Sequence, residues 1–414
     1  MVNRKRILPL ALGLILLLGL CAGCVQEVPP ETAHPSYGTE VAATGEGIPQ
    51  GDTPPQSYPV PQENRLGANV LLAGVASPRA DGYYSASQAL KFYDAQSGKT
   101  VFLCSQPGCT HSDGTCRAWL GQVDSLLAYG DKVFASVTDE QGTSVICKDI
   151  ATGENTVLDS WEQQEDRTYS SSVYRCSHGQ LLVILTISFP YWEDGAIYQE
   201  TVRENWLYDL ETGEKRKLDW ASGDAGFTVC AMNREYAVVE YYSPQKGETQ
   251  GNSWEQVMDL ELRQYSLSDD SYTVISSGED GYAFTAHPGK AYGDLVVFQE
   301  RDTLCLYDLK KQEKRETLTA ENIINYWILD NKVFFIREDS PHGTPGRTIS
   351  IYYADLETGQ PVRLENGGNT EVMEFGIHWE GDSFFVGNWK GGSYIISKEV
   401  FYLDNYEAAR PGGY

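Results

Sequence analysis

A short hairpin pattern recurs along this chain and restricts the folds that it can adopt more than any other feature. The clearest copy covers residues 207–214 and reads Leu-Tyr-Asp-Leu-Glu-Thr-Gly-Glu. Related copies occupy 92–99, 147–154, 264–270, 306–311 and 353–360. Aromatic and aliphatic residues favour strands, whereas Asp and Gly favour tight turns because they tolerate a positive φ. Each copy therefore predicts two antiparallel strands joined by a tight turn.

A second pattern, a polar turn followed by a strongly apolar strand, precedes each hairpin. It occurs seven times, at 82–84, 130–134, 179–183, 234–238, 293–297, 331–335 and 381–385. The first six are followed by a copy of the hairpin, and the seventh by a degenerate copy at 393–399. Seven units over about 340 residues give about 49 residues for each unit of four strands, which is typical of propeller blades. The sequence therefore predicts an all-β chain that forms a β-propeller of four-stranded blades. Seven blades fit best, and six or eight stay open.

A pair of β-sandwiches would also place turn signals at regular intervals. The constant order of polar turn, apolar strand and Tyr-Asp hairpin favours blades over sandwiches. We expect the propeller domain to span residues 67–414. We also expect the segment 69–76 to supply an early strand that meets the last blade and closes the ring, because closure removes exposed sheet edges.

The beginning of the chain is typical of an export signal followed by a linker. Basic residues at positions 4–6 precede the apolar run 7–20, which is too short for a membrane-spanning helix and is followed by small residues. Residues 25–66 contain eight prolines and almost no aliphatic clusters. Such a composition cannot bury a core. We therefore expect a signal peptide at 1–23 and a disordered tether at 24–66.

The chain is strongly acidic, with 58 Asp and Glu residues against 32 Lys and Arg residues and a formal net charge of -26. A nucleic acid backbone would be repelled overall, so we expect no nucleic acid partner. Long runs of acidic residues do not occur in the sequence. We therefore interpret the charge as a solubility feature of a protein outside the cell.

Three cysteines and one histidine lie close together between the first and second units: Cys104, Cys109, His111 and Cys116, at a C-x4-C-x-H-x4-C spacing. A proline and a glycine let the backbone fold back here, so that the four side chains can converge on a tetrahedral ion such as Zn²⁺. The spacing differs from that of a zinc knuckle. Two alternatives stay open, namely a disulfide with one remaining thiol, and reduced thiols packed under a loop. Seven cysteines follow Cys24, and this odd number argues against a disulfide framework.

Aromatic residues lie in the longer predicted loops, beside acidic and amide groups. The four that stand out are Tyr191, Trp192, Trp254 and Trp389. Exposed rings in such a setting can stack on sugar rings or hold a peptide. The alternative is that they only pack their loops onto the propeller. We therefore expect either a ligand-binding surface or a set of structural anchors.

Signatures of established catalytic sites are missing from the sequence. The segment 97–100, Ser-Gly-Lys-Thr, lacks the earlier glycine of a phosphate-binding loop and falls on a predicted hairpin turn. Neither a G-x-S-x-G elbow nor an H-E-x-x-H helix occurs. We therefore predict no catalytic residue. The many carboxylates nevertheless leave an extracellular polysaccharide hydrolase or lyase open as the alternative function.

Residues 20–24, Leu-Cys-Ala-Gly-Cys, resemble the lipobox of bacterial lipoproteins, with Cys21 where Leu is usual. Together with the proline-rich tether, the repeated hairpin and the Cys/His stretch, this makes the chain similar to propeller-bearing surface lipoproteins of anaerobic Gram-positive bacteria. That group is related in fold to TolB-like and low-density-lipoprotein-receptor-like propellers. The resemblance implies that Cys24 is lipidated and anchors the protein to the extracellular face of the bacterial cell membrane. It implies no catalytic residue.

These patterns together predict a membrane-anchored extracellular propeller that binds a glycan, a peptide or a protein partner. A structural zinc ion in the loop between the first two blades is the one cofactor that we expect. The membrane is a partner of this protein only through the lipid anchor.

Overall fold

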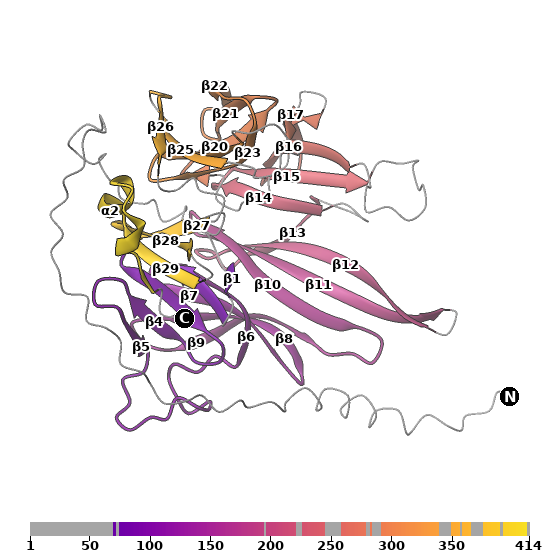
Figure 1. The fold of residues 1–414 in the computed structure, drawn as a ribbon. Coiled ribbons are helices and arrows are strands. Elements are labelled where there is room, and N and C mark those ends of the chain that lie inside the picture. The colour runs from indigo at the N-terminus through magenta and orange to yellow at the C-terminus, as the bar shows by residue number, and fades with distance from the viewer. Residues whose placement is uncertain are drawn as a thin grey trace. The chain divides into compact units, whose positions relative to one another are not determined.

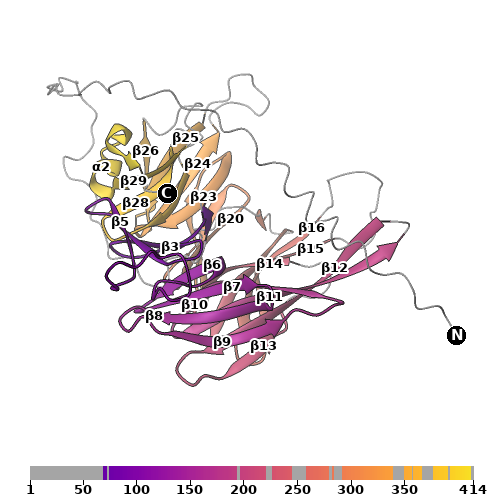
Figure 2. The same ribbon diagram turned by 90° about the horizontal axis from the view of Figure 1, so that it is seen from below.

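The repeated units fold into seven antiparallel sheets arranged as a β-propeller, which confirms the predicted fold class (Figures 1 and 2). The computed structural model describes residues 69–71, 74–193, 196–220, 226–244, 258–278, 282–283, 291–338, 349–356, 358–365, 376–389 and 392–411. The predicted signal peptide, Cys24 and the tether lie outside these residues. Within the described residues, no helix is long and apolar enough to cross a membrane.

Each blade consists of consecutive strands of the chain. Blades 1 and 2 contain β1–β5 (Asn69–Leu71, Gly74–Pro78, Gly82–Ala86, Lys91–Asp94 and Lys99–Phe102) and β6–β9 (Gln122–Tyr129, Lys132–Asp139, Gly142–Asp149 and Asn155–Glu162). Blades 3 and 4 contain β10–β13 (Thr168–Ser177, Gln180–Glu193, Ala196–Asp209 and Lys215–Leu218) and β14–β17 (Gly226–Met232, Tyr236–Pro244, Met258–Ser266 and Tyr272–Ser277).

The second half of the chain continues in the same way. Blade 5 contains β18–β22 (Tyr282–Ala283, Ala291–Tyr292, Leu295–Glu300, Thr303–Asp308 and Glu313–Thr319), with two short strands at its inner position. Blade 6 contains β23–β26 (Ile323–Leu329, Lys332–Glu338, Ile349–Asp355 and Pro361–Leu364). Blade 7 contains β27–β30 (Gly376–Glu380, Phe384–Trp389, Gly392–Ser397 and Arg410–Pro411), with helix α2 (Lys398–Tyr402) and the 3-10 turn η4 (Tyr406–Ala408) between its last two strands.

The hydrogen bonds of the turn explain why the same residues recur in each hairpin. In blade 3, Oδ1 of Asp209 accepts hydrogen bonds from the backbone N–H groups of Glu211 and Thr212, both at 2.9 Å. Gly213 follows with a φ of 75°. The next residue after the aspartate, Leu210, donates its N–H to the carbonyl oxygen of Gly179 at 2.8 Å, which ties the hairpin to the first turn of the same blade. The Asp therefore caps the turn, as its occurrence in the repeats predicts.

A separate cluster of buried side chains fills each contact between neighbouring blades. Between blades 1 and 2, Tyr84 and Leu90 pack with Leu126. Between blades 5 and 6, Val297 packs with Tyr326. The other neighbouring pairs pack in the same manner. Since burying one such side chain stabilises the fold by about 1.5–3 kcal/mol, these clusters are the main source of cohesion between the sheets.

Among the described strands, the ring closes without an exchange between blades, so the prediction that a strand from residues 69–76 closes the ring by joining the last blade was wrong. Strands β1 and β2 pair with each other, and β2 pairs with β3, all within blade 1. Blade 7 already has an outer strand, because the chain turns through α2 and η4 and returns as β30 beside β29. The two end blades instead share a cluster of buried side chains: Ala76, Tyr83, Tyr93, Ala95, Phe384, Val386 and Ile395.

Two hydrogen bonds add to this closing contact. Nη2 of Arg410 donates to the carbonyl oxygen of Ala95 at 2.6 Å, and the N–H of Asp382 donates to the carbonyl oxygen of Ala80 at 2.9 Å. The blade at the beginning of the chain and the blade at its end lie side by side in both views (Figures 1 and 2). Side chains and these two bonds, rather than a shared sheet, therefore hold the seam.

A buried group of charges joins blades 6 and 7. Asp330 is fully buried and lies 3.0 Å from Nζ of Lys398 and 3.3 Å from Nζ of Lys332. The hydroxyl of Tyr402 donates to Asp330 at 2.7 Å. Glu380 lies 2.7 Å from Lys398 and accepts a hydrogen bond from the N–H of Asp330. Among the described residues, two carboxylates and two ammonium groups thus face one another and fix α2 against both blades.

Strands β11 and β12 extend beyond the rest of blade 3 (Figures 1 and 2). They pair along their whole length, from Gln180 opposite Asp209 to Glu193 opposite Ala196. The flanking strand β10 pairs with β11 only as far as Ser188, and β13 pairs with β12 only over Asn205–Tyr208. The outer part of the hairpin is therefore a two-stranded ribbon.

Candidate metal site and exposed hairpin tip

The four predicted metal ligands converge. One ligand atom from each of Cys104, Cys109, His111 and Cys116 lies within 4.8 Å of all the others. Nδ1 of His111 is 3.3 Å from Sγ of Cys116. All three cysteines are free thiols, so the described structure contains no disulfide at this place. The predicted convergence of the cluster is confirmed, and the group can hold a metal ion.

The loop folds back through two tight turns. Gly108 has a φ of 73°, and the N–H of Cys109 donates to the carbonyl oxygen of Gln106 at 3.3 Å. Further along, the N–H of Cys116 donates to the carbonyl oxygen of Asp113 at 3.1 Å. His111 itself has a φ of 56°, a conformation that is uncommon for residues other than glycine. These turns bring the ligands together over a short stretch of chain.

The thiols have different electrostatic surroundings. Hydrogen bonding to the backbone N–H of Gln106, with smaller contributions from the other two thiols, lowers the pKa of Cys104 to about 7. Burial raises the pKa of the Cys116 thiol to about 11, although the N–H of Ala118 donates to its sulfur at 3.3 Å. Backbone N–H groups directed at sulfur favour the thiolate form, which is the form that binds metals.

The imidazole is held by an aromatic neighbour. The ring of His111 stacks on that of Phe102, with a centroid distance of 4.2 Å and an interplanar angle of 15°. Nζ of Lys91 lies 5.0 Å from the centre of the Phe102 ring. The stacking fixes the plane of the imidazole and so helps to keep Nδ1 beside Cys116.

The Cys/His loop bridges two blades. The N–H of Leu90 in blade 1 donates to the carbonyl oxygen of Ala118 at 2.7 Å. On the other side, Nδ2 of Asn155 in blade 2 donates to the carbonyl oxygen of Trp119 at 3.4 Å. Cys116 packs with Ala118 in a small buried cluster under the loop. A metal ion at this place would therefore stiffen the connection between blades 1 and 2.

Lys148, in β8 next to the cluster, is a residue that the sequence patterns above do not single out. Its side chain is almost fully buried, and Nζ donates to the carbonyl oxygen of Gly153 and to Oδ1 of Asn155, both at 3.0 Å. Burial lowers the pKa of Lys148, and the charges of Cys116 and Cys104 act in the opposite direction. Among the described residues, both hydrogen-bond acceptors of this lysine are uncharged oxygen atoms.

The repeats contain a signal for this lysine. Position 148 corresponds to the residue before the capping Asp, and the other copies place a buried Tyr or Ala there: Tyr93, Tyr208, Tyr265, Tyr307 and Ala354. A lysine at a position where the other copies have a buried Tyr or Ala indicates a local need for positive charge. The hairpin alignment could therefore have identified Lys148 without a structure.

Two of the predicted ligand-binding aromatics lie at the tip of the long hairpin. Tyr191 is 44% exposed and Trp192 is 71% exposed. They are neighbours on β11, so their side chains point to opposite faces of the ribbon. Trp254 lies outside the described residues, and Trp389 ends β28 with a side chain that is not described. The structure thus places Tyr191 and Trp192 next to each other in the chain but on opposite faces of the ribbon, and ligand binding by the four residues stays a prediction.

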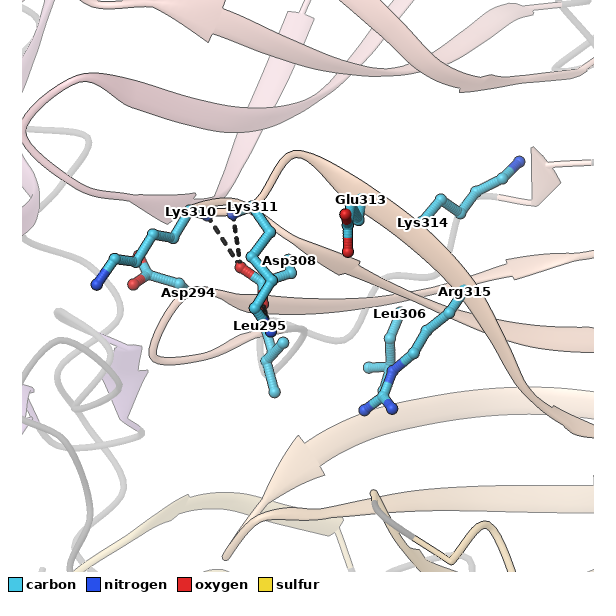
Figure 3. A pocket seen from close by; sticks show the side chains of 9 residues that line it. All are labelled: Asp294, Leu295, Leu306, Asp308, Lys310, Lys311, Glu313, Lys314 and Arg315. Carbon is cyan, nitrogen blue, oxygen red and sulfur yellow. Dashed lines mark hydrogen bonds and ion pairs between the residues drawn. The ribbon is translucent and has the colours of Figure 1, made fainter.

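A charged cavity of about 450 Å³ lies at the hairpin turn of blade 5 (Figure 3). It is lined by Asp294, Leu295, Leu306, Asp308, Lys310, Lys311, Glu313, Lys314 and Arg315. Asp308 accepts hydrogen bonds from the N–H groups of Lys310 and Lys311, and Nζ of Lys311 lies 3.0 Å from its carboxylate. These are the contacts of the repeated turn, so the cavity is explained by the hairpin and is not a candidate active site.

Comparisons with other proteins add little beyond the fold. No protein-family model matches the sequence, and no curated protein matches it. Among solved structures, the chain is similar to dipeptidyl peptidase 4 of Porphyromonas gingivalis, with 12% identity over 76% of this chain and 46% of the peptidase, at a TM-score of 0.44. It is similar to an oligogalacturonate lyase in complex with manganese, with 10% identity over 83% of this chain and 97% of the lyase, at a TM-score of 0.45.

The chain is also similar to TolB from Acinetobacter baumannii, with 10% identity over 69% of this chain and 60% of TolB, at a TM-score of 0.28. It therefore spans less than two thirds of TolB and less than half of the peptidase. At such low identities, these likenesses concern the propeller architecture alone. The strand pairing described above establishes that architecture independently.

Proposed function

We propose that this chain is a lipid-anchored surface propeller whose Cys/His loop holds a structural zinc ion. The observation that carries the proposal is the convergence of four ligand atoms within 4.8 Å. Zinc–sulfur bonds of about 2.3 Å in a tetrahedron would place the sulfur atoms about 3.8 Å apart. A small contraction of the loop is therefore enough to form the site.

The ligand set favours a structural role over a catalytic one. Three thiolates and one imidazole fill all four positions of a tetrahedral zinc ion, whereas catalytic zinc keeps one position for water. The loop contacts blades 1 and 2, and blade 1 borders the seam of the ring. The proposed role of the ion is to clip this end blade to its neighbour.

Metal analysis of residues 67–414, purified under reducing conditions without added metal, tests this role. The expected result is about one zinc ion per chain in the unchanged protein, and none in the Cys109→Ser variant. Cys305→Ser is the matched control, because Cys305 is a buried thiol in blade 5 and should not affect zinc content. An unchanged protein without metal, or a Cys109→Ser variant that keeps it, would refute the zinc site.

The proposal assigns ligand recognition to the tip of the blade 3 hairpin. Trp192 is the most exposed of the large apolar side chains in the described structure, and an exposed indole suits the face of a sugar ring or a peptide side chain. Binding to a panel of glycans and peptides should be lost in Trp192→Ala. It should persist in the control Tyr272→Ala, which removes a 49% exposed ring from the outer strand of blade 4. Equal binding by both variants would contradict the assignment.

The same panel separates a binding protein from the alternative, a polysaccharide hydrolase or lyase. A binder retains the glycan unchanged, whereas an enzyme releases shorter products that chromatography detects. The proposal predicts retention without cleavage. Cleavage that persists in Trp192→Ala would favour the enzyme and would place its site elsewhere.

Attachment to the membrane is the remaining part of the proposal, and it rests on the sequence of residues 20–24. Cys24 would carry the lipid, and the tether would hold the propeller away from the extracellular face of the membrane. The full chain should incorporate a labelled fatty acid and sediment with membranes, whereas Cys24→Ser should do neither. Labelling of Cys24→Ser would show that the acceptor is another residue.

A further inference from the structure

The surroundings of Lys148 bear on the charge of the neighbouring cluster. Its ammonium group is almost completely buried and bonds to two neutral oxygen atoms, the carbonyl of Gly153 and the amide of Asn155. A buried charge without an opposite charge is strongly unfavourable. The other buried lysines, Lys332 and Lys398, each have carboxylate partners. Lys148 therefore needs an anion from another source.

The Cys/His cluster is the available source. Asn155, which accepts a hydrogen bond from Nζ of Lys148, donates to the carbonyl oxygen of Trp119 at 3.4 Å, and the N–H of Trp119 donates to the carbonyl oxygen of Cys116 at 3.0 Å. Three protonated thiols would be neutral, and a disulfide with one thiol would be neutral as well. Three thiolates and a neutral imidazole around a divalent ion carry a net charge of about -1, which one lysine balances.

We infer that Lys148 is the counter-charge of a singly negative metal centre, formed by a divalent ion on three thiolates and a neutral His111. This inference rests on the proposed zinc site and adds a residue that acts on it from outside the ligand set. Lys148 is a positioning residue, because it touches no ligand atom in the hydrogen bonds described. Its side chain is fixed by Gly153 and Asn155, so the charge is held at one place next to the cluster.

The net charge of the centre depends on the metal ion. A monovalent ion such as Cu⁺ would give the centre a charge of about -2, which exceeds what Lys148 neutralises. A divalent ion such as Zn²⁺ or Co²⁺ leaves no negative charge in excess of the charge on Lys148. Lys148 should therefore strengthen the binding of divalent ions to three thiolates.

The test compares zinc affinity in three lysine variants of residues 67–414, measured by competition with a chromogenic chelator. Lys148→Met keeps the length of the side chain and removes its charge, and should weaken zinc binding about 10–100-fold, as loss of an outer partner does in other metal sites. Lys148→Arg should retain more affinity than Lys148→Met. Lys99→Met removes an exposed charge from β5 of blade 1 and should change the affinity less than about twofold.

Two further readouts separate the charge from a loss of structure. Without metal, the buried ammonium group of the unchanged chain has no opposite charge beside it. Lys148→Met removes this group, so the metal-free variant should melt at the same temperature as the metal-free unchanged chain or higher. With Co²⁺, both proteins should give the absorption bands of a tetrahedral thiolate site. Equal zinc affinity in Lys148→Met and the unchanged chain would overturn the inference and leave the zinc site intact. A failure of both proteins to bind zinc would instead refute the site itself.

Discussion

Replacing Lys398 by Met removes one of the two ammonium groups between blades 6 and 7. In the native structure Nζ of Lys398 lies 3.0 Å from Asp330 and 2.7 Å from Glu380, and its side chain is 1% exposed. Of the two ammonium groups described here, the variant leaves the two buried carboxylates with that of Lys332. Breaking a buried ion pair by removing one partner destabilises a protein by about 3–5 kcal/mol. Because Lys398 contacts both carboxylates, we expect a loss in the upper half of that range.

Urea unfolding of residues 67–414, followed by tryptophan fluorescence, measures this loss. A second variant, Lys398→Met with Glu380→Gln, removes one charge of each sign and restores the balance. It should recover at least half of the lost free energy of unfolding. A loss below about 1 kcal/mol in the single variant would place the pair among those that contribute little. A double variant no more stable than the single one would refute the charge-balance argument.

The pH dependence of the single variant gives an independent check. Burial raises the pKa of Glu380, and Lys398 opposes this shift in the native protein. Without Lys398 the folded state favours the protonated carboxyl group more strongly than the unfolded chain does. Stability should therefore be regained as the pH falls toward the raised pKa, so the loss should be smaller at about pH 5 than at about pH 8. Equal losses at both pH values would contradict this explanation.

Three further predictions follow from the turns and the loop. Gly213→Ala, at a φ of 75°, should destabilise the chain by about 1 kcal/mol, whereas Gln312→Gly, at a φ of 58°, should stabilise it, as thermal melts can measure. Backbone N–H groups lower the pKa of Asp209, so its stabilising effect is present above the unfolded pKa of about 3.9 and is lost as the pH falls through the lower folded value. Asp209→Asn should therefore make melting less sensitive to acid below about pH 4, and an unchanged acid profile would contradict this. Removing zinc with a chelator should lower the free energy of unfolding by about 3 kcal/mol relative to protein in zinc at 100 times its Kd, and should not affect Cys109→Ser.

The blades were predictable because their turns are encoded locally. Asp209 and Gly213 occupy the two positions that the turn geometry requires, and both can be read from one copy of the repeat. The weak copy in blade 4 folds in the same way, with Oγ of Ser266 accepting from the N–H of Ser268 and with Asp270 at a φ of 59°. When the side chains that stabilise a turn lie within a few residues of it, the turn can be recognised from the sequence.

The closure of the ring was not predictable in this way, and the repeats single out Lys148 without showing that it lies beside the Cys/His cluster. The segment 69–76 has the composition of a strand, and the composition does not reveal whether its partner is β3 or the last blade. That choice depends on η4 and β30, which fill the outer position of blade 7. For the Cys/His cluster, spacing predicted convergence, whereas the positive charge beside it comes from a different blade. Contacts between distant segments set both features.

Since no blade combines strands from the first and last described segments, folding of the blades need not wait for the last of them. Blade 1 can complete its sheet as soon as residue 102 has emerged, and each later blade can then pack on the one before it. In such an order, most contacts form between residues that are close in the sequence, and apolar strands stay exposed only for a short time. The contact between the first and last blades then forms at the end. Hydrogen exchange should accordingly detect opening at this contact before any sheet is lost.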